Sequence, residues 1–540
     1  MKPLTLSRLL LPIYVGAETP TATLDSGPVF GLTTTLPAAS PVNKFLGIPY
    51  AAKTQRFSRA KKPEPWTKPL NATRFGPSCR QLFVQSANLV ELTPEIDLLK
   101  GLFNTASRES EDCLYINAFA PADPYPSRAV LLFISGGGWQ QGNGEVDLSG
   151  FAAYEDVVVF TFNYRTNVFG FPNSPDIPAS EINLGIHDQQ LAIEWVQRNA
   201  RAFGGDPDKV TIWGESAGAM SVDIHVNRYT SPPFRAAMMF SGQMSVGYLG
   251  STASHHDTSY WDNLTTVVGC QGPDQLQCMR EVPGDDLVKA MGTAGSAFLP
   301  ITDNVTILSD RAERWRDGDV AIIPVLMGTI AEEGRGLINR NISLETFLGA
   351  YLSEPLVSKS QQKTILKAYD DSSLKTDFDV AAAIYTDFVW QCPQAILANI
   401  SASVNPTWRF YFNASVTSLL DDKYSWLGKF HGSDVLLLFN TPTFDTMSPQ
   451  LYTFAEYLRG VVGRFVRNPQ AGPGWPVGSR YVANLGDVGQ TQTSGPSIID
   501  QTVLDQRCSL YESIYPLIEE PPNTTQSRCN VISPIVVYVI

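Results

Sequence analysis

Apolar residues along this 540-residue chain gather in short continuous runs and do not alternate with polar residues. A strand covered on both faces has this pattern, because neither face meets water. Runs of this kind lie at residues 129–134, 157–162, 210–213, 322–327 and 408–412. They predict buried strands of a parallel sheet that is flanked by helices.

A helical pattern lies between two of these runs, where residues 187–203 carry apolar side chains at three- and four-residue steps. His187 opens this segment. Gly204 and Gly205 end it, because glycine readily adopts the left-handed conformation that closes helices. Strands and helices that alternate in this way predict an open α/β sheet. Catalytic residues are then expected beyond the carboxyl ends of its strands.

Composition and charge indicate a globular protein and argue against some classes of partner. Apolar residues make up 43% and charged residues 17% of the chain, which is typical of a globular protein. The net charge of −13 argues against nucleic acid or an anionic membrane surface as a partner. No apolar run has the length of a membrane span, and no Cys or His spacing is typical of a zinc site.

The first 17 residues, MKPLTLSRLLLPIYVGA, predict a signal peptide and hence a secreted, extracellular protein. Lys2 and Arg8 are basic, residues 9–15 are apolar, and small residues precede the expected cleavage after Ala17; the alternative is an apolar tail. Seven Asn-x-Ser/Thr sequons add support, because N-glycosylation occurs on secreted chains. They begin at Asn71, Asn263, Asn304, Asn341, Asn399, Asn413 and Asn523.

Cysteine usage also suits a secreted chain. Seven cysteines occur, which implies disulfides with one thiol left over. Cys270 and Cys278 are close enough in sequence to close one small loop. The last ten residues, VISPIVVYVI, are apolar, and they predict a packed or frayed terminus, with part of a lipid-anchor signal as the less favoured alternative.

The run at 210–213 ends in Gly-Glu-Ser-Ala-Gly, with Ser216 at its centre. Gly214 and Gly218 suit a sharp strand-to-helix turn that exposes a nucleophilic serine. A second motif, the triple glycine 136–138, directly follows the run at 129–134. Its backbone N–H groups can approach a ligand without obstruction by a Cβ, so it predicts an oxyanion-binding loop; the alternative is a flexible turn.

A serine nucleophile needs a base and an acid that orients the base. Glu332 and Glu333 follow the run at 322–327, and both are candidate acids, with a solvated turn as the alternative. His431 follows both of them, which gives the order serine, acid, histidine. The other histidines have different predicted settings: His187 at a helix start, His225 on the helix after Ser216, and His255 and His256 in a polar loop.

These motifs, with several others in the same order, resemble the carboxylesterase type B family, which includes lipases and cholinesterases. The resemblance covers nearly the whole chain after residue 17. The stretches that carry it are FLGIPYA (45–51), Arg56-Phe57, SEDCLYIN (110–117), GGGW (136–139), NYR (163–165), FGF (169–171), DQQLAIEWVQ (188–197), FGGDP (203–207), GESAGA (214–219), EEG (332–334), HG (431–432) and RCSLYESIYPLI (507–518).

The resemblance implies a single α/β-hydrolase domain over residues 18–540, with a large, mostly parallel central sheet. It implies Ser216, Glu333 and His431 as the catalytic triad. The backbone N–H groups of Gly137, Gly138 and Ala217 would form the oxyanion hole. The implied disulfides are Cys79–Cys113, Cys270–Cys278 and, as in some members, Cys392–Cys508, which leaves Cys529 as the odd thiol.

Three positions depart from the family pattern. Ser135 stands where mammalian members often have His, with little effect expected, because the glycines carry the donors. The segment 80–112 has no Trp, whereas cholinesterases use one there to hold a quaternary ammonium. A choline ester is therefore not the expected substrate. Asn167 stands where small residues are common, and the sequence offers no functional interpretation of it.

The same segment, 80–112, is a predicted lid, because lipase-like members close a lid with this disulfide. Its centre, TPEIDLLKGLF, is amphipathic, with Thr93 as a cap and Pro94 in the first turn. An amphipathic helix can cover an acyl site and open at a lipid surface. The equally favoured alternative is a helix that packs permanently on the body.

The sequence therefore predicts a secreted serine hydrolase that cleaves small-molecule or lipid carboxylic esters through an acyl-enzyme, with no metal or cofactor. A triacylglycerol lipase with interfacial activation is the runner-up. A non-catalytic adhesion or binding homologue is a distant alternative, because such relatives lose the nucleophile and this chain retains it.

Overall fold

The computed structural model describes residues 19–83, 108–123, 125–251, 258–354, 356–439, 447–486 and 496–519. Several predicted features lie outside these ranges: the signal peptide, the central part of the 80–112 segment with its predicted lid helix, His255, His256, Asn523, Cys529 and the apolar last ten residues.

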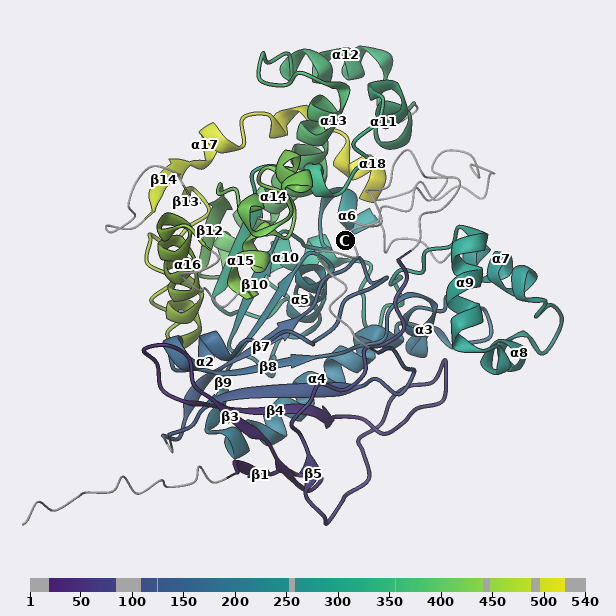
Figure 1. Ribbon diagram of the computed structural model, residues 1–540. Coiled ribbons are helices and arrows are strands. Elements are labelled where there is room, and N and C mark those ends of the chain that lie inside the picture. Colours follow the sequence, from purple (N-terminus) through teal and green to yellow (C-terminus); the bar gives the residue numbers. More distant parts are fainter. Residues whose placement is uncertain are drawn as a thin grey trace, which may run out of the picture.

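An 11-stranded sheet forms the centre of the molecule (Figure 1). Its strands follow the order β14-β13-β12-β11-β10-β9-β7-β8-β6-β4-β3. Neighbours from β13 to β8 are parallel, whereas β14 at one end and β6, β4 and β3 at the other are antiparallel to their neighbours. The strands span β3 (Leu32–Thr34), β4 (Val42–Pro49), β6 (Tyr115–Pro121), β7 (Arg128–Ile134), β8 (Val158–Phe162), β9 (Gly205–Glu215), β10 (Ala236–Phe240), β11 (Val325–Ile330), β12 (Thr407–Phe412), β13 (Tyr481–Leu485) and β14 (Ser497–Asp500).

All five predicted strands belong to this sheet, as β7, β8, β9, β11 and β12, which confirms the α/β prediction. The predicted bounds 322–327 were wrong at the start, since β11 begins at Val325. Pro324, which has no N–H to donate, precedes it, and Ile322 is 57% exposed. The strand β10 was not predicted, although its five residues are all buried.

The predicted helix over 187–203 is α4 (Leu184–Asn199), which continues into the 3-10 turn η2 (Ala200–Phe203). Gly204, at φ +80°, closes it as expected. Two details were wrong. Gly205 is the first residue of β9, and His187 lies inside the first turn, because the buried residues Leu184 and Ile186 extend the apolar face toward the N-terminus.

The apolar strands contribute side chains to two cores, one on each face of the sheet. In β7, Val130, Leu132 and Ile134 belong to the core that also contains residues of α4 and α5 (Ala217–Arg228). Leu131 and Phe133 belong to the other core, with residues of α2 (Ser149–Glu155) and α16 (Pro449–Arg467). Because successive side chains point to opposite faces, a strand between two helical layers must be apolar at every position.

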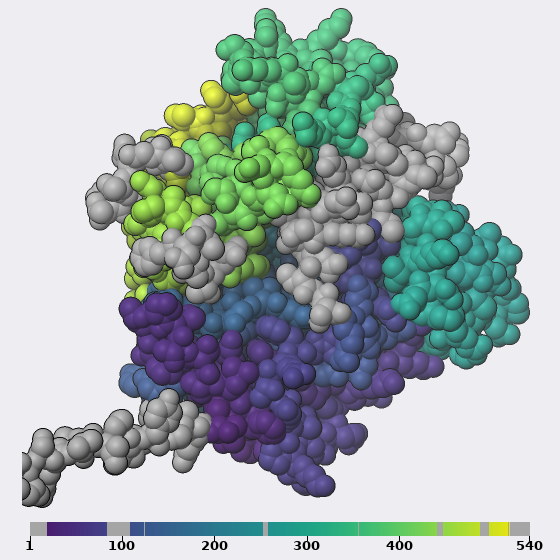
Figure 2. Space-filling view, in the orientation of Figure 1, coloured from purple at the N-terminus to yellow at the C-terminus, as the bar shows by residue number. Residues whose placement is uncertain are grey.

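Further helices surround this body (Figures 1 and 2). A group at the right of both figures comprises α7 (Ser259–Val268), α8 (Gln275–Glu281) and α9 (Gly284–Ala294). A group at the top comprises α11 (Leu344–Tyr351), α12 (Lys359–Ala368) and α13 (Asp377–Tyr385). The others are α3 (Asn167–Gly170), α6 (Gly247–Ser251), α10 (Arg311–Asp317), α14 (Cys392–Val404), α15 (Ser433–Phe439), α17 (Gln501–Leu504) and α18 (Tyr515–Glu519).

A small separate sheet completes the N-terminal part, with the strands β1 (Thr21–Thr23), β2 (Pro28–Phe30) and β5 (Leu70–Asn71) in the order β1-β2-β5. Among the helices of the described ranges, none has the length and apolar character that crossing a membrane requires.

Candidate active site

Ser216 lies on the sharp turn between β9 and α5, as its motif predicts. Its backbone has φ +56° and ψ −127°, a strained conformation that residues other than glycine rarely adopt. The turn is anchored by the Ser216 N–H, which donates to the carbonyl of Phe240 at 3.0 Å. Strain of this kind at a strand end is typical of a functional residue.

The two glycines of the motif leave room for this turn. A Cβ on Gly214 would lie 2.2 Å from the carbonyl oxygen of Gly218, and one on Gly218 would lie 2.1 Å from the carbonyl oxygen of Ile134. Both distances are far shorter than a normal contact. The turn therefore requires glycine at both positions for steric reasons.

The glycine loop 136–138 follows β7 and lies against the turn that carries Ser216. A Cβ on Gly136 would come within 3.0 Å of the Ser216 Cβ. Gly137 and Gly138 have φ of +106° and +59°, so their peptide groups take orientations that favour glycine. In the part of the chain that the structure describes, the N–H groups of Gly137, Gly138 and Ala217 donate to no protein acceptor. These three donors are available to a ligand.

Asn167, which the sequence left without an interpretation, supports the glycine loop. Its backbone N–H donates to the carbonyl of Trp139 at 2.6 Å. Its side-chain amide donates to the carbonyls of Gln140 at 3.1 Å and Arg80 at 2.7 Å. Asn167 thereby ties the end of the loop to the chain beside Cys79.

Glu333 and His431, which lie 98 residues apart in sequence, meet in the structure. Glu333 follows β11 in the 3-10 turn η3 (Glu333–Gly336), and His431 precedes α15. The Glu333 Oε2 lies 2.6 Å from the His431 Nδ1, and its Oε1 accepts the Ile330 N–H at 2.7 Å. Both side chains are buried, so the pair is shielded from water. Glu332 does not contact this ring, and its carboxylate binds the backbone N–H of Lys429.

The second ring nitrogen of His431 faces the turn that carries Ser216. Its Nε2 lies 3.3 Å from Oε1 of Glu215, the residue that precedes the serine. Trp390 covers the ring, with the two ring centroids 4.4 Å apart. Trp390 belongs to the π-helical segment η4 (Thr386–Gln391), a rare element that is frequent at functional sites. No local sequence signal identified Trp390, because only the fold brings it to the histidine.

Two further buried carboxyl groups surround His431. Burial raises the pKa of Glu215 well above its ordinary value, although the charge of His431 opposes the shift. Burial, followed by the charge of Glu333, raises the pKa of Asp434 to about 7. The Asp434 Oδ1 accepts the Val435 N–H at 2.7 Å. Three carboxyl groups, those of Glu215, Glu333 and Asp434, thus lie around one imidazole, and the raised pKa values favour the protonated forms of Glu215 and Asp434.

The other described histidines stay away from this pair. His225, on α5, contacts Gln189 on α4 at 3.1 Å, and burial together with the charge of Arg228 lowers its pKa to about 3. The His187 Nε2 lies 3.0 Å from the Ser180 carbonyl. Neither contacts Glu332 or Glu333, so among the histidines that the structure describes His431 alone has a carboxylate partner of the expected kind.

Three disulfides join the cysteine pairs that the family resemblance implied. The S–S distances are 2.07 Å for Cys79–Cys113, 1.97 Å for Cys270–Cys278 and 2.00 Å for Cys392–Cys508. Five predicted glycosylation residues are exposed, namely Asn71, Asn263, Asn304, Asn341 and Asn399, whereas Asn413 is half-buried and accepts a hydrogen bond from Lys429.

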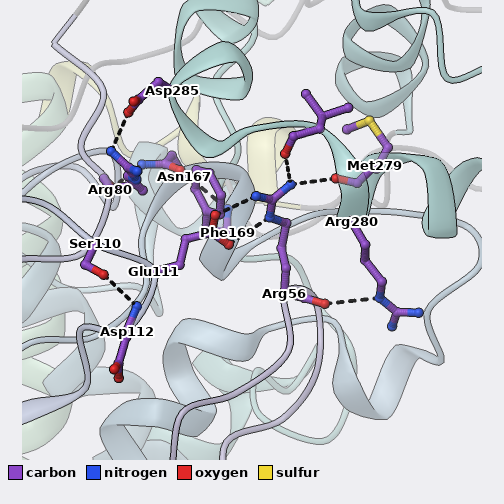
Figure 3. Close-up of polar contacts among 11 residues, drawn as sticks. Arg56, Arg80, Ser110, Glu111, Asp112, Asn167, Phe169, Met279, Arg280 and Asp285 are labelled. Atoms are coloured by element: carbon purple, nitrogen blue, oxygen red, sulfur yellow. Dashed lines mark hydrogen bonds and ion pairs between the residues drawn. The ribbon is translucent and has the colours of Figure 1, made fainter.

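Ion pairs anchor the base of the loop that Cys79–Cys113 closes (Figure 3). Arg56 binds the Glu111 carboxylate through two nitrogens and donates to the carbonyl of Met279, on α8, at 2.7 Å. Arg80 pairs with Asp285 on α9. The loop base and the α7–α9 group are thus held together. Over the described ranges, no three His, Cys, Asp or Glu side chains come together as metal ligands would.

Comparison with known proteins agrees with this geometry. The model of the carboxylesterase family matches residues 18–476. The chain is 31% identical to lipase 2 of Diutina rugosa over 78% of this chain and 83% of the lipase. It is 30% identical to mouse cholinesterase, over 78% and 74% of the two chains, and to the para-nitrobenzyl esterase of Bacillus subtilis, over 69% and 75%. The chain therefore belongs to the carboxylesterase family, with an α/β-hydrolase fold, and is a carboxylic ester hydrolase.

Proposed function

We propose that the protein hydrolyses carboxylic esters through an acyl-enzyme, with Ser216 as nucleophile, His431 as base and Glu333 as the acid that orients the base. The supporting observation is the 2.6 Å contact between Glu333 and His431, with the other ring nitrogen turned toward the strained turn of Ser216. A buried carboxylate on Nδ1 fixes the tautomer in which Nε2 carries no proton and can accept one.

In the first step, Nε2 of His431 takes the proton of Ser216 while Oγ attacks the ester carbonyl. The carbonyl oxygen becomes an oxyanion, which accepts hydrogen bonds from the N–H groups of Gly137, Gly138 and Ala217. Each such donor contributes roughly 3–4 kcal/mol to the stability of the transition state. His431 then protonates the leaving alcohol. Water attacks the acyl-enzyme with the same histidine as base and releases the acid.

The test is a burst experiment with an activated p-nitrophenyl ester. The wild-type protein should release a burst of nitrophenol equal to its active-site concentration, and Ser216→Ala should abolish it. A burst that survives this substitution would remove Ser216 from the mechanism. Neutral His431 is required, so kcat/KM should fall on acidification as the imidazole takes up a proton. A flat profile down to pH 4 would contradict His431 as the base.

A triacylglycerol lipase is the second candidate, and the similarity to lipase 2 of Diutina rugosa favours it. The predicted lid over 80–112 belongs to this proposal. A rate that jumps when the substrate exceeds its micelle threshold would support a lipase. Hydrolysis that is fastest on soluble short-chain p-nitrophenyl esters, with no jump, would support a general carboxylesterase.

We also propose that the protein is secreted. Three disulfides support an oxidising compartment, and the five exposed sequon asparagines are accessible to glycosylation. Expression in a eukaryotic host should yield protein in the medium that begins near residue 18. Its mass should fall on treatment with a glycosidase that removes N-glycans. Retention inside the cell with residues 1–17 attached would contradict the proposal.

A further inference from the structure

The loop that carries Glu333 and the loop that carries His431 are joined by a reciprocal pair of hydrogen bonds. The Lys429 N–H donates to Oε2 of Glu332 at 2.7 Å, and the Glu332 N–H donates to the carbonyl of Lys429 at 3.1 Å. Lys429 lies only two residues before His431, and Glu332 lies directly before Glu333. The two bonds therefore join the two loops at the residue before Glu333 and two residues before His431.

The chain of the histidine loop is shaped around the Glu332 carboxylate. Gly428 has φ +63°, and a Cβ at this position would lie 2.2 Å from Oε2 of Glu332. Any side chain would therefore displace the carboxylate from the Lys429 N–H or push the loop away. Glycine at 428 lets the carboxylate approach the backbone directly.

Arg335 makes a second link between the same two loops, farther from the histidine. Its Nε donates to the carbonyl of Trp426 at 2.9 Å, and its Nη1 pairs with Asp379 on α13 at 2.9 Å. This link fixes residue 426, five residues before His431. The glycine at 428 lies between the two links, so Arg335 alone leaves the backbone next to His431 free to shift.

We propose that Glu332 is a positioning residue for ester hydrolysis, whose carboxylate holds the Lys429 N–H and thereby fixes His431 against Glu333. The inference rests on the proposed roles of Ser216, Glu333 and His431. A hydrogen bond from a backbone N–H to a carboxylate is stronger than one between neutral groups. A histidine that must reach both a carboxylate and a serine tolerates little displacement, because a misplacement of about 1 Å can reduce a rate about 100-fold.

The paired acid residues of the Glu-Glu-Gly motif then have different tasks. Glu333 contacts the imidazole, and Glu332 contacts the backbone that carries it. The alternative is that Glu332 only stabilises the fold of the loop. In that case its loss would lower the number of folded molecules and leave the turnover of each folded molecule unchanged.

The experiment measures turnover per active site, with the active sites counted by the burst of an activated p-nitrophenyl ester. Glu332→Ala should lower kcat about 10- to 100-fold with KM changed by less than about threefold, because substrate contacts remain. Glu332→Gln retains an oxygen acceptor and should stay within about fivefold of wild type. The control Glu64→Ala removes an exposed carboxylate in a loop and should have no effect.

A Glu332→Ala enzyme whose kcat per active site stays within about twofold of wild type would overturn the proposal, whatever its melting temperature. Equal losses in the Gln and Ala variants would also overturn it, since the oxygen acceptor would then be irrelevant. If Glu332→Ala fails to fold, Glu332→Asp shortens the reach but keeps the charge, and its kcat should fall at least about fivefold. An Asp variant with wild-type kcat would refute the proposal. Absence of a burst in the wild-type protein would instead refute the proposed acyl-enzyme.

Discussion

The two halves of the candidate site are held by different means. The serine side consists of the glycine loop 136–138 and residues 214–218, and steric fit shapes it: a Cβ on Gly214 or Gly218 would overlap backbone atoms at 2.1–2.2 Å. The histidine side consists of residues 332–335 and 426–431, where hydrogen bonds join two loops, and its one close fit described above, at Gly428, serves the hydrogen bond of Glu332. Overlapping backbone atoms must move apart, which alters the fold around them. A hydrogen bond between two loops can be lost while the fold stays intact.

Because of this difference, substitutions on the two sides should differ in how they affect stability and turnover. The serine side lies between β7, β9 and α5, at the centre of the sheet, so a Cβ added at Gly214 or Gly218 disturbs the core. The histidine side lies on loops beyond β11 and before α15. Substitutions there should impair turnover with less effect on stability.

The largest effect is expected for Gly218→Ala on the serine side. The new Cβ would lie 2.1 Å from the carbonyl oxygen of Ile134, in β7, so the strand or the turn must move. Overpacking of this kind costs about 1–3 kcal/mol or more, and we expect both a lower melting temperature and no measurable ester hydrolysis. The matched control is Gly349→Ala on α11, where a Cβ meets nothing within 4 Å. A Gly218→Ala enzyme with wild-type melting temperature and activity would contradict the steric argument.

The next effect is expected for Glu333→Gln on the histidine side. The amide cannot stabilise a positively charged imidazole as the carboxylate does, and it can favour the wrong tautomer. We expect kcat to fall roughly 10³- to 10⁴-fold, while the melting temperature changes by only a few degrees. Calorimetry and burst kinetics on the same sample measure both quantities. A loss smaller than about tenfold would assign the acid to another residue.

The sequence predicted the serine side more fully than the histidine side. The reason is that steric fit leaves a local motif in the sequence, whereas hydrogen bonds between distant loops do not. Ser216, its glycines and the glycine loop are marked by local motifs, because steric fit requires particular residues at fixed spacing. From the residues alone, Glu332 and Glu333 remained alternatives, and the family resemblance selected Glu333. Which of the two reaches a histidine 98 residues away depends on how two loops pack.

Three other features could not be predicted from the sequence. Trp390 lies in a π-helical segment far from both motifs, and only tertiary packing brings it to His431. Asn167 had no interpretation until its hydrogen bonds to three backbone carbonyls were visible. The buried strand β10 has the sequence Ala-Ala-Met-Met-Phe, and its alanines and methionines favour a helix, whereas β-branched residues, which mark a strand, do not occur in it.

A smaller effect is expected for Trp390→Phe. The indole lies over the His431 ring, and an aromatic face stabilises a cation by about 0.5–2 kcal/mol, with Trp better than Phe. We expect kcat/KM to fall about 3- to 10-fold, and the acidic limb of the pH–rate profile to move to lower pH, because the imidazolium is less stable. The matched control is Trp195→Phe, a buried indole of α4 in the same apolar core as Trp390. Equal kinetic losses in both variants would indicate general loss of packing.

The smallest effect on activity, but a distinct effect on stability, is expected for Asp434→Asn. The Asp434 carboxyl keeps its proton up to about pH 7 in the folded protein, because burial and the charge of Glu333 raise its pKa. In the unfolded chain the carboxyl ionises near pH 4. Folding therefore becomes less favourable as the pH rises from about 4 to about 7, and the cost is complete above pH 7.

Asparagine has no proton to lose, so the melting temperature of Asp434→Asn relative to wild type should rise by a few degrees between pH 4.5 and pH 8. Asp370→Asn, at an exposed position, should show no such trend. Because the charge of Glu333 contributes to the raised pKa, the trend should shrink in a Glu333→Gln background. A trend of equal size in that background would mean that burial alone raises the pKa of Asp434. The carboxyl groups of the histidine side would then act independently, and its loops would be coupled only through their hydrogen bonds.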